Sequence, residues 1–128
     1  MKKLLCLVIV CVMLVSVSGC SQIRISSNEK ATISGYKGDA DVVVCELTSE
    51  QTEKVRSILM KADYNPGIGG CYYDEAVSII FGEKVFSVAS DGCHTIWAVN
   101  TGKHYEISEE DFKYIMLLYV ECGLRYIK

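Results

Sequence analysis

VSIIFGEKVFSVA, residues 77–89, is the stretch of sequence that decides the fold of this chain. Apolar side chains alternate on both sides of its central Gly-Glu pair, and glycine at the first position of that pair favours a two-residue type II′ turn. Such a turn places Ile79 opposite Phe86. It also places Val77 opposite Val88, on the same face of the ladder. The stretch therefore predicts an antiparallel β-hairpin with one buried face.

Further elements are predicted on both sides of this hairpin. In chain order we expect a strand at 41–47, a helix at 49–62, strands at 77–81, 85–89, 95–99 and 104–107, and a helix at 109–122. Thr48 and Gln51 form a capping box for the first helix, and Ser108 is the N-cap of the second. This order (strand, helix, four strands, helix) indicates an α+β domain, with two helices packed on one face of a small antiparallel sheet.

The N-terminal residues have the pattern of an export signal. Lys2-Lys3 precedes an apolar run at 4–17, which suits a secretory signal and is shorter than the about 20 residues of a spanning helix. The run ends in Val17-Ser18-Gly19-Cys20. This motif resembles the lipobox of bacterial lipoproteins, which implies a signal peptide at 1–19 and a fatty-acid anchor on Cys20, at the extracytoplasmic face of the cell membrane. An uncleaved membrane anchor and an ordinary signal peptide cut nearby are the alternatives.

Removal of the signal leaves an acidic domain. The chain has 13 Lys and Arg against 16 Asp and Glu, and two of the lysines lie in the signal, so the mature charge is 11 − 16 = −5. That charge argues against nucleic acid as a partner and against a polybasic contact with anionic lipid. We expect the polar residues 20–40 to form a tether, with alternation near Ile23 and Ile33 that also permits a short strand. Residues 41–128 are expected to form one globular domain.

Four cysteines remain in the mature chain besides Cys20, and an even number in an exported protein predicts disulfide bonds. The hairpin register, extended outward with a single bulge, brings Cys71 opposite Cys93, and we predict a bond between them. Cys45 and Cys122 both face inward from their elements. They form either a second bond or two buried free thiols.

Patterns for catalysis and metal binding are weak. Ser90, Asp91 and His94 have the residue types of a hydrolase triad, but triad members converge from separate elements and these three lie within five residues. His94 and His104 lack the spacing of zinc-ligand motifs. We therefore predict no enzyme activity, no metal and no cofactor. The alternative is a small envelope enzyme or metal-binding protein that uses these two histidines.

Aromatic residues are the best indication of a binding surface. Tyrosine and tryptophan present a large contact area with few rotatable bonds, which suits recognition. Five of them lie near the glycine-rich loop at 65–70 or on the neighbouring strands: Tyr64, Tyr72, Tyr73, Trp97 and Tyr105. The alternative for each ring is that it covers the core or an edge of the sheet.

Two segments carry a further resemblance. Pro66-Gly67-Ile68 after the first helix and Tyr105-Glu106-Ile107-Ser108 before the second are similar to small YhfM-like lipoproteins of Gram-positive bacteria. The resemblance implies a similar fold and location. We therefore expect a lipid-anchored, non-enzymatic binding or interaction module of the cell envelope, whose partner is an envelope protein or a small ligand.

The anchor can be tested by the substitution Cys20→Ala. The alanine has no thiol to acylate, so we expect the variant to lose labelling by a radioactive fatty acid. It should also leave the membrane fraction or keep its signal uncleaved. Equal labelling of the variant and the unaltered protein would show that Cys20 is not the acceptor.

Overall fold

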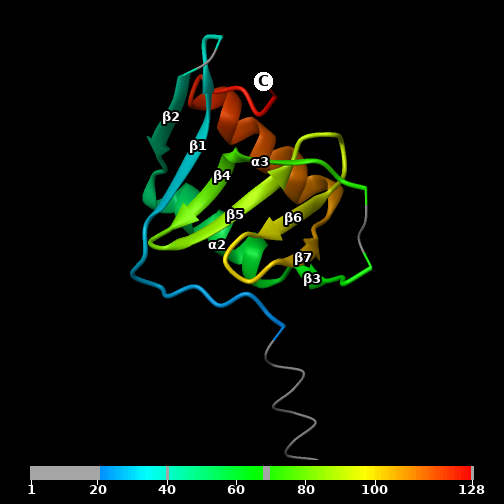
Figure 1. Cartoon of the computed structure of the whole chain (residues 1–128). Helices are drawn as coiled ribbons and strands as arrows, with labels where there is room; N and C mark the ends of the chain where they lie inside the picture. The colour runs from blue at the N-terminus through cyan, green and yellow to red at the C-terminus, as the bar shows by residue number, and fades with distance from the viewer. Residues whose placement is uncertain (1–20, 40, 68–69, 128) are drawn as a thin grey trace, which may run out of the picture.

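The computed structural model describes residues 21–39, 41–67 and 70–127, so the predicted signal peptide and Cys20 lie outside the described residues. Within those ranges the chain is an α+β protein dominated by strands (Figure 1). The elements are β1 (Ala31–Lys37), β2 (Asp41–Glu46), α2 (Ser49–Met60), β3 (Asp63–Tyr64), β4 (Tyr73–Phe81), β5 (Lys84–Ala89), β6 (Thr95–Ala98), β7 (Lys103–Glu106) and α3 (Glu109–Glu121). None of the described helices is long and apolar enough to cross a membrane.

The strands form a single open sheet in which the neighbours are antiparallel. Their order across the sheet is β2-β1-β4-β5-β6-β7-β3, so β2 and β3 are the edge strands. The order along the chain differs from the predicted one by two added strands, β1 before β2 and β3 after α2. β3 is only two residues long and pairs with β7, and so short a strand leaves little alternation in the sequence to reveal it.

The central hairpin forms as predicted near its turn. Ile79 lies opposite Phe86, and Gly82 has a φ of 58°. Positive φ occurs at glycine and not at Glu83, which agrees with a type II′ turn. Beyond Ser78 and Ser87 the register shifts, so the predicted pairing of Val77 with Val88 is wrong.

The shift is larger than the single bulge that we expected. Ser78 lies opposite Ser87, whereas Tyr73 lies opposite Ala89, so five steps along β4 oppose two steps along β5. The three extra residues belong to the segment 74–77, which we call the β4 bulge. Even with this shift, Cys71 and Cys93 form a disulfide at the base of the hairpin, as predicted.

The expectation of a polar tether at residues 20–40 is wrong for its described part. Residues 31–37 form β1, which lies between β2 and β4. Ile23 and Ile25 are each only 6% exposed, and Ile33 is fully buried. The serines, glycines and lysines make this segment polar on average. Its few apolar side chains are nevertheless covered by the sheet and the helices. The folded domain therefore includes residue 21, and its predicted start at residue 41 is also wrong.

Both helices begin where their caps predict. The Thr48 side chain accepts from the Gln51 backbone N–H while the Gln51 side chain accepts from that of Thr48, which completes the capping box. Ser108 caps α3 through the backbone N–H of Asp111. The Asp111 carboxylate pairs with Lys61 at 3.2 Å, which joins α3 to the end of α2.

One core joins the helices to the sheet. In Figure 1 the sheet lies in front and both helices run behind it. The fully buried large side chains come from both layers: Tyr119, Phe81, Ile33, Ile58, Leu59, Ile79, Ile96, Ile115, Leu118, Val55, Val77 and Val88. Burial of this many large apolar side chains is the main favourable contribution to folding.

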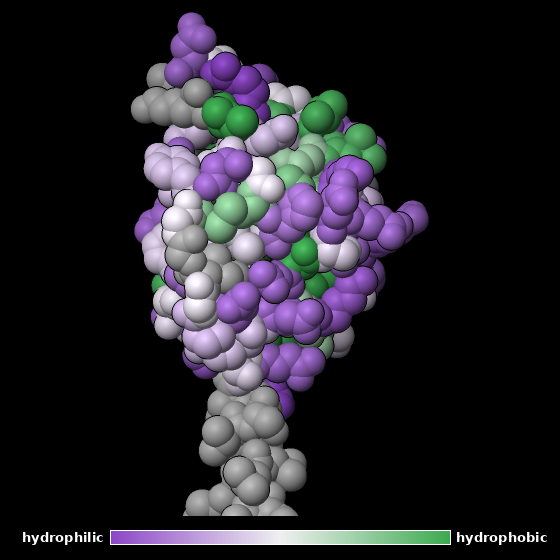
Figure 2. Space-filling model, turned by 90° about the vertical axis from the view of Figure 1, so that its right-hand side faces the viewer, coloured by the Kyte–Doolittle hydropathy of each residue, from purple (hydrophilic) through white to green (hydrophobic). Residues whose placement is uncertain are grey.

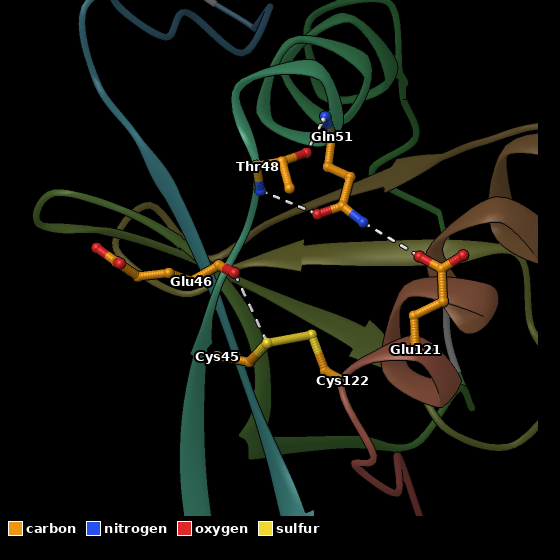
Figure 3. The surroundings of a disulfide bond; sticks show 6 residues. All are labelled: Cys45, Glu46, Thr48, Gln51, Glu121 and Cys122. Carbon is orange, nitrogen blue, oxygen red and sulfur yellow. Dashed lines mark hydrogen bonds between the residues drawn. A yellow bond between two sulfur atoms is a disulfide. The ribbon is translucent and has the colours of Figure 1, made fainter.

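A second disulfide joins the end of α3 to the edge of the sheet (Figure 3). Cys45 of β2 bonds to Cys122, which resolves the two alternatives left by the sequence. Next to this bond the Gln51 amide donates to the Glu121 carboxylate at 3.1 Å. The start of α2, the end of α3 and an edge strand therefore meet at one place.

Close packing beside this region depends on Gly35 in β1. A Cβ atom at this position would lie 2.9 Å from the Arg125 carbonyl oxygen and 3.0 Å from the Tyr119 ring. Glycine therefore lets the C-terminal residues approach β1, where Tyr36 and Arg125 exchange two backbone hydrogen bonds.

We predict that Gly35→Ala lowers the free energy of unfolding by about 1–3 kcal/mol, because the added methyl overpacks the contact. Gly67→Ala is the matched control, since its nearest neighbour would be a side-chain oxygen at an ordinary 3.5 Å. Denaturant unfolding of both variants measures the difference. Equal stability of the two variants would contradict the role given to Gly35.

Candidate functional site

A row of polar and aromatic side chains crosses the face of the sheet that does not point into the core. Residues directly opposite each other on paired strands share a face. The register places Ser34 opposite Ser78, Ser78 opposite Ser87, Ser87 opposite Trp97, and Trp97 opposite His104. The neighbouring row through Ile33, Ile79 and Phe86 points into the core. We call the face with Trp97 and His104 the open face.

The β4 bulge covers the middle of the open face. Ser78 and Ser87 are fully buried although they point away from the core. The Ser87 hydroxyl lies 2.9 Å from the Asp74 carbonyl oxygen, to which it donates, and the Ser78 hydroxyl donates to the Glu75 carbonyl at 2.7 Å. The bulge backbone therefore folds back over the serines, whose hydroxyls satisfy carbonyls that lost their ladder partners.

Asp74 fixes the conformation of the bulge. One of its carboxylate oxygens accepts from the backbone N–H of Ala76 at 3.0 Å, and the other accepts from the Tyr36 hydroxyl. The hydrogen bond to the carboxylate raises the pKa of Tyr36 above its ordinary value, with burial and the charge of Asp74 acting in the same direction. A charge-assisted bond thus ties the bulge to β1.

Beside the bulge, three rings form what we call the aromatic cluster: Tyr73, Trp97 and His104. The Tyr73 ring centre lies 5.4 Å from that of His104 and 6.0 Å from that of Trp97. The Trp97 and His104 rings are stacked, with an angle of 16° between their planes. Each ring is partly exposed. The cluster therefore offers a solvent-accessible aromatic surface next to an imidazole that can donate or accept hydrogen bonds.

A hydrogen bond orients Tyr73 within the cluster. Its hydroxyl donates to the Thr95 hydroxyl at 2.7 Å, so the ring is held by its tip as well as by its neighbours. Burial raises the pKa of Tyr73, and the hydrogen bond to Thr95 partly opposes that shift. The ring is therefore neutral and in a defined position at physiological pH.

The structure divides the five aromatic residues that the sequence predicts for a binding surface. Tyr73 and Trp97 come together in the aromatic cluster. Tyr64 and Tyr105 pair with each other at 5.8 Å, and Tyr105 is only 3% exposed, so its assignment to a surface is wrong. Tyr105 is buried because strand alternation turns it toward Ile96 and the core, opposite to His104. Tyr72 is well exposed outside both groups.

The two histidines lie on opposite faces of the sheet. His104 belongs to the open face, whereas the His94 ring packs 4.9 Å from the Phe112 ring of α3. The backbone bond from Ile107 to the His94 carbonyl continues the ladder that pairs Trp97 with His104. Because His94 and Trp97 are an odd number of residues apart, they point to opposite sides. A single site that uses both histidines is therefore not formed by this arrangement.

One group among the described residues has the geometry of metal ligands: Cys71, Asp91 and Cys93. Both sulfur atoms are engaged in the disulfide. The Asp91 carboxylate accepts from the backbone N–H groups of Tyr72 and Cys93, at 2.8 and 3.3 Å. The three residues therefore lie close together because the disulfide and the two hydrogen bonds of Asp91 join two adjoining loops.

A separate groove of about 590 Å³ lies at the end of the sheet next to the N-terminal segment. It runs between residues 22–29 and the turns of the β4–β5 and β6–β7 hairpins. Charged side chains of both signs line it, among them Arg24, Lys84 and Glu83. Its walls also include the buried side chains of Ile23 and Phe86.

The view in Figure 2, turned by 90° from that of Figure 1, shows a mainly hydrophilic side of the molecule, with hydrophobic residues in separate patches.

Comparison with known proteins adds no functional assignment: no family model, curated protein or solved structure matches the chain.

The sequence marks Trp97 and His104 as candidate residues, but it does not pair them. The signal was present in the two predicted strands at 95–99 and 104–107, because a short turn between them places positions 97 and 104 opposite each other. The β4 bulge left no comparable signal, since nothing in its residue types specifies a shift of three.

Substitution of Asp74 by asparagine tests the link between the bulge and β1. Without the carboxylate charge, the pKa of Tyr36 should fall toward 10.0, so a tyrosinate absorbance change appears at lower pH. Tyr36→Phe removes the same titration and identifies it. A group whose pKa is higher in the folded than in the unfolded state stabilises the protein at pH values below its unfolded-state pKa. This stabilisation is lost as the pH rises through the folded-state pKa. Asp74→Asn should therefore reduce stability at neutral pH, and the deficit should shrink at alkaline pH. A deficit independent of pH would contradict this.

Proposed function

We propose that the mature chain is a lipoprotein of the cell envelope, anchored through Cys20, that acts as a non-enzymatic binding module. Its recognition site is the aromatic cluster of Tyr73, Trp97 and His104 on the open face. This cluster is the observation that carries the proposal, because it combines exposed aromatic area with fixed geometry.

Two disulfides support the assignment to an oxidising compartment. Cys45 pairs with Cys122, and Cys71 pairs with Cys93, so all four cysteines of the described domain are used. Structural disulfides persist outside the cytosol and are rare inside it. The bonds thus agree with the export signal at the N-terminus, while the lipid itself rests on the resemblance of residues 17–20 to a lipobox.

The arrangement of layers supports recognition on the open face. If both helices cover the other face, as in Figure 1, the open face remains accessible beyond the area that the β4 bulge covers. Trp97 and His104 stand on adjacent strands, and the Thr95 hydroxyl holds Tyr73. A partner therefore meets rings that are already ordered, which reduces the entropy lost on binding.

The chemistry of the cluster indicates which ligands it can accept. Aromatic faces contact apolar or planar groups over a large area, and they attract cations through the ring quadrupole. The imidazole of His104 adds one polar anchor. These properties suit a side chain of an envelope protein or a small ligand with a flat or cationic group.

Photo-crosslinking in intact cells tests the site directly. With benzoylphenylalanine at position 97, we expect ultraviolet light to give a discrete adduct with an envelope protein, or a mass increase that corresponds to a small ligand. The same amino acid at position 37, an exposed residue beside the β1–β2 turn, is the control. Adducts that are equal at both positions, or absent at position 97, would refute recognition by the open face.

A further inference from the structure

The residues that follow Cys20 join the folded domain at once. The Tyr105 hydroxyl donates to the carbonyl oxygen of Ser21 at 2.6 Å, and the Gln22 side chain donates to the carbonyl of Met60 at 3.0 Å. Tyr105 lies on β7 and Met60 at the end of α2. The first two described residues are therefore attached to two different elements of the domain.

The rest of the segment is held along its length. Ile23 and Ile25 are buried in the hydrophobic core. The carboxylate of Glu29 lies 3.7 Å from the Lys84 ammonium, and its backbone carbonyl accepts from the Arg56 guanidinium. The segment 21–29 is thus packed against the domain and does not act as a tether.

This attachment limits how far the domain can lie from a lipid on Cys20. A chain spans at most about 3.6 Å per residue, so the Cα atom of Gln22 lies within roughly 7 Å of that of Cys20. A flexible linker of about 20 residues, such as the tether expected from composition, would have a mean span of ~25 Å. The difference decides whether the domain moves freely above a membrane or rests on it.

We propose that the lipid on Cys20 holds the domain directly against the bilayer, in one orientation, with the groove beside residues 22–29 facing the phospholipid headgroups. We call this part of the molecule the anchor end. It includes Arg24, the β4–β5 turn with Lys84, and the β6–β7 turn with Lys103. The inference rests on the proposed lipidation of Cys20.

Figure 1 shows which part of the domain then points away from the membrane. The chain enters the domain at the lower end of the view, whereas the β1–β2 turn lies at the opposite end, near the C-terminus. Lys37 is exposed beside that distant turn. The reactivities of Lys84 and Lys37 therefore measure how accessible the two ends of the same molecule are.

The side chains of the anchor end suit a headgroup layer. Arg24, Lys84 and Lys103 carry cationic groups on long apolar stems, and such stems can lie along a membrane surface. The domain itself holds two of these groups, because Lys84 pairs with Glu29 and the Lys103 ammonium lies over the Tyr64 ring. Glu29 and Glu83 lie among them, so the surface carries both signs, as phospholipid headgroups do. The mature charge of −5 gives no general attraction to an anionic bilayer. The short attachment to Cys20 therefore supplies the contact, and the local side chains select the orientation.

Lysine reactivity on vesicles tests this orientation. The lipid-modified protein is reconstituted into vesicles of phosphatidylcholine and phosphatidylglycerol and treated with a membrane-impermeant acylating reagent, and the modification of each lysine is measured by mass spectrometry. The matched control carries a flexible Gly-Ser insertion of about 20 residues between Cys20 and Ser21, long enough to lift the domain by ~25 Å. The ratio of Lys84 to Lys37 reactivity cancels the fraction of protein that faces the vesicle interior.

We expect the ratio of Lys84 to Lys37 reactivity to be several-fold lower in the protein without the insertion than in the variant with it. The ratio of Lys103 to Lys37 reactivity should change in the same direction. Circular dichroism of both proteins checks that the insertion leaves the fold intact. Equal ratios in two lipid-modified proteins would overturn the orientation and leave the anchor standing. Absence of the lipid from both proteins by mass would overturn the anchor and, with it, this inference.

Discussion

Strand β1 lies between β2 and β4, and Ile33 stands opposite Cys45 on one side and Ile79 on the other. Without β1, β2 would have no neighbour in the sheet and the central hairpin would be exposed on the β4 side. The same strand carries Gly35 and Tyr36, which contact the C-terminal residues and the β4 bulge. The core, the edge of the sheet and the open face therefore all depend on residues 31–37.

The register shift in β4 determines which side chains are exposed on the open face. A regular β4 strand would leave Ser78 and Ser87 exposed in the centre of the sheet. The three extra residues instead fold over the serines, and the register shift brings Tyr73 beside Trp97 and His104. Burial of polar groups near the bulge is compensated by hydrogen bonds to its own carbonyls. The same irregularity thus creates the aromatic cluster and limits the accessible area around it.

The proposed anchor and the proposed recognition site belong to different parts of the domain. The anchor end is formed by residues 22–29 and two hairpin turns, whereas the aromatic cluster stands on β4, β6 and β7. If the domain rests on the bilayer in one orientation, the cluster is held at a fixed angle to the membrane. A membrane-bound partner could then meet it without the loss of orientational freedom that a tethered domain incurs.

Local patterns in the sequence determined the central hairpin, both helix caps and the Cys71–Cys93 bond. Each of these depends on residues that are close in the chain or on alternation around one turn, and such signals are readable without a partner. The sequence likewise contains the lipobox-like motif that ends at Cys20, which remains a prediction.

Only the tertiary structure decided the remaining features. β1 is stabilised by its two neighbouring strands and by burial of Ala31, Ile33 and Tyr36. These contacts are not visible in its polar composition, which pointed to a tether. Cys45 and Cys122 are 77 positions apart, and their pairing depends on how α3 packs beside β2. The burial of Tyr105 and the grouping of Tyr73 with Trp97 and His104 follow from strand register and the bulge. These features arise from contacts between distant segments, and residue type alone does not specify which segments meet.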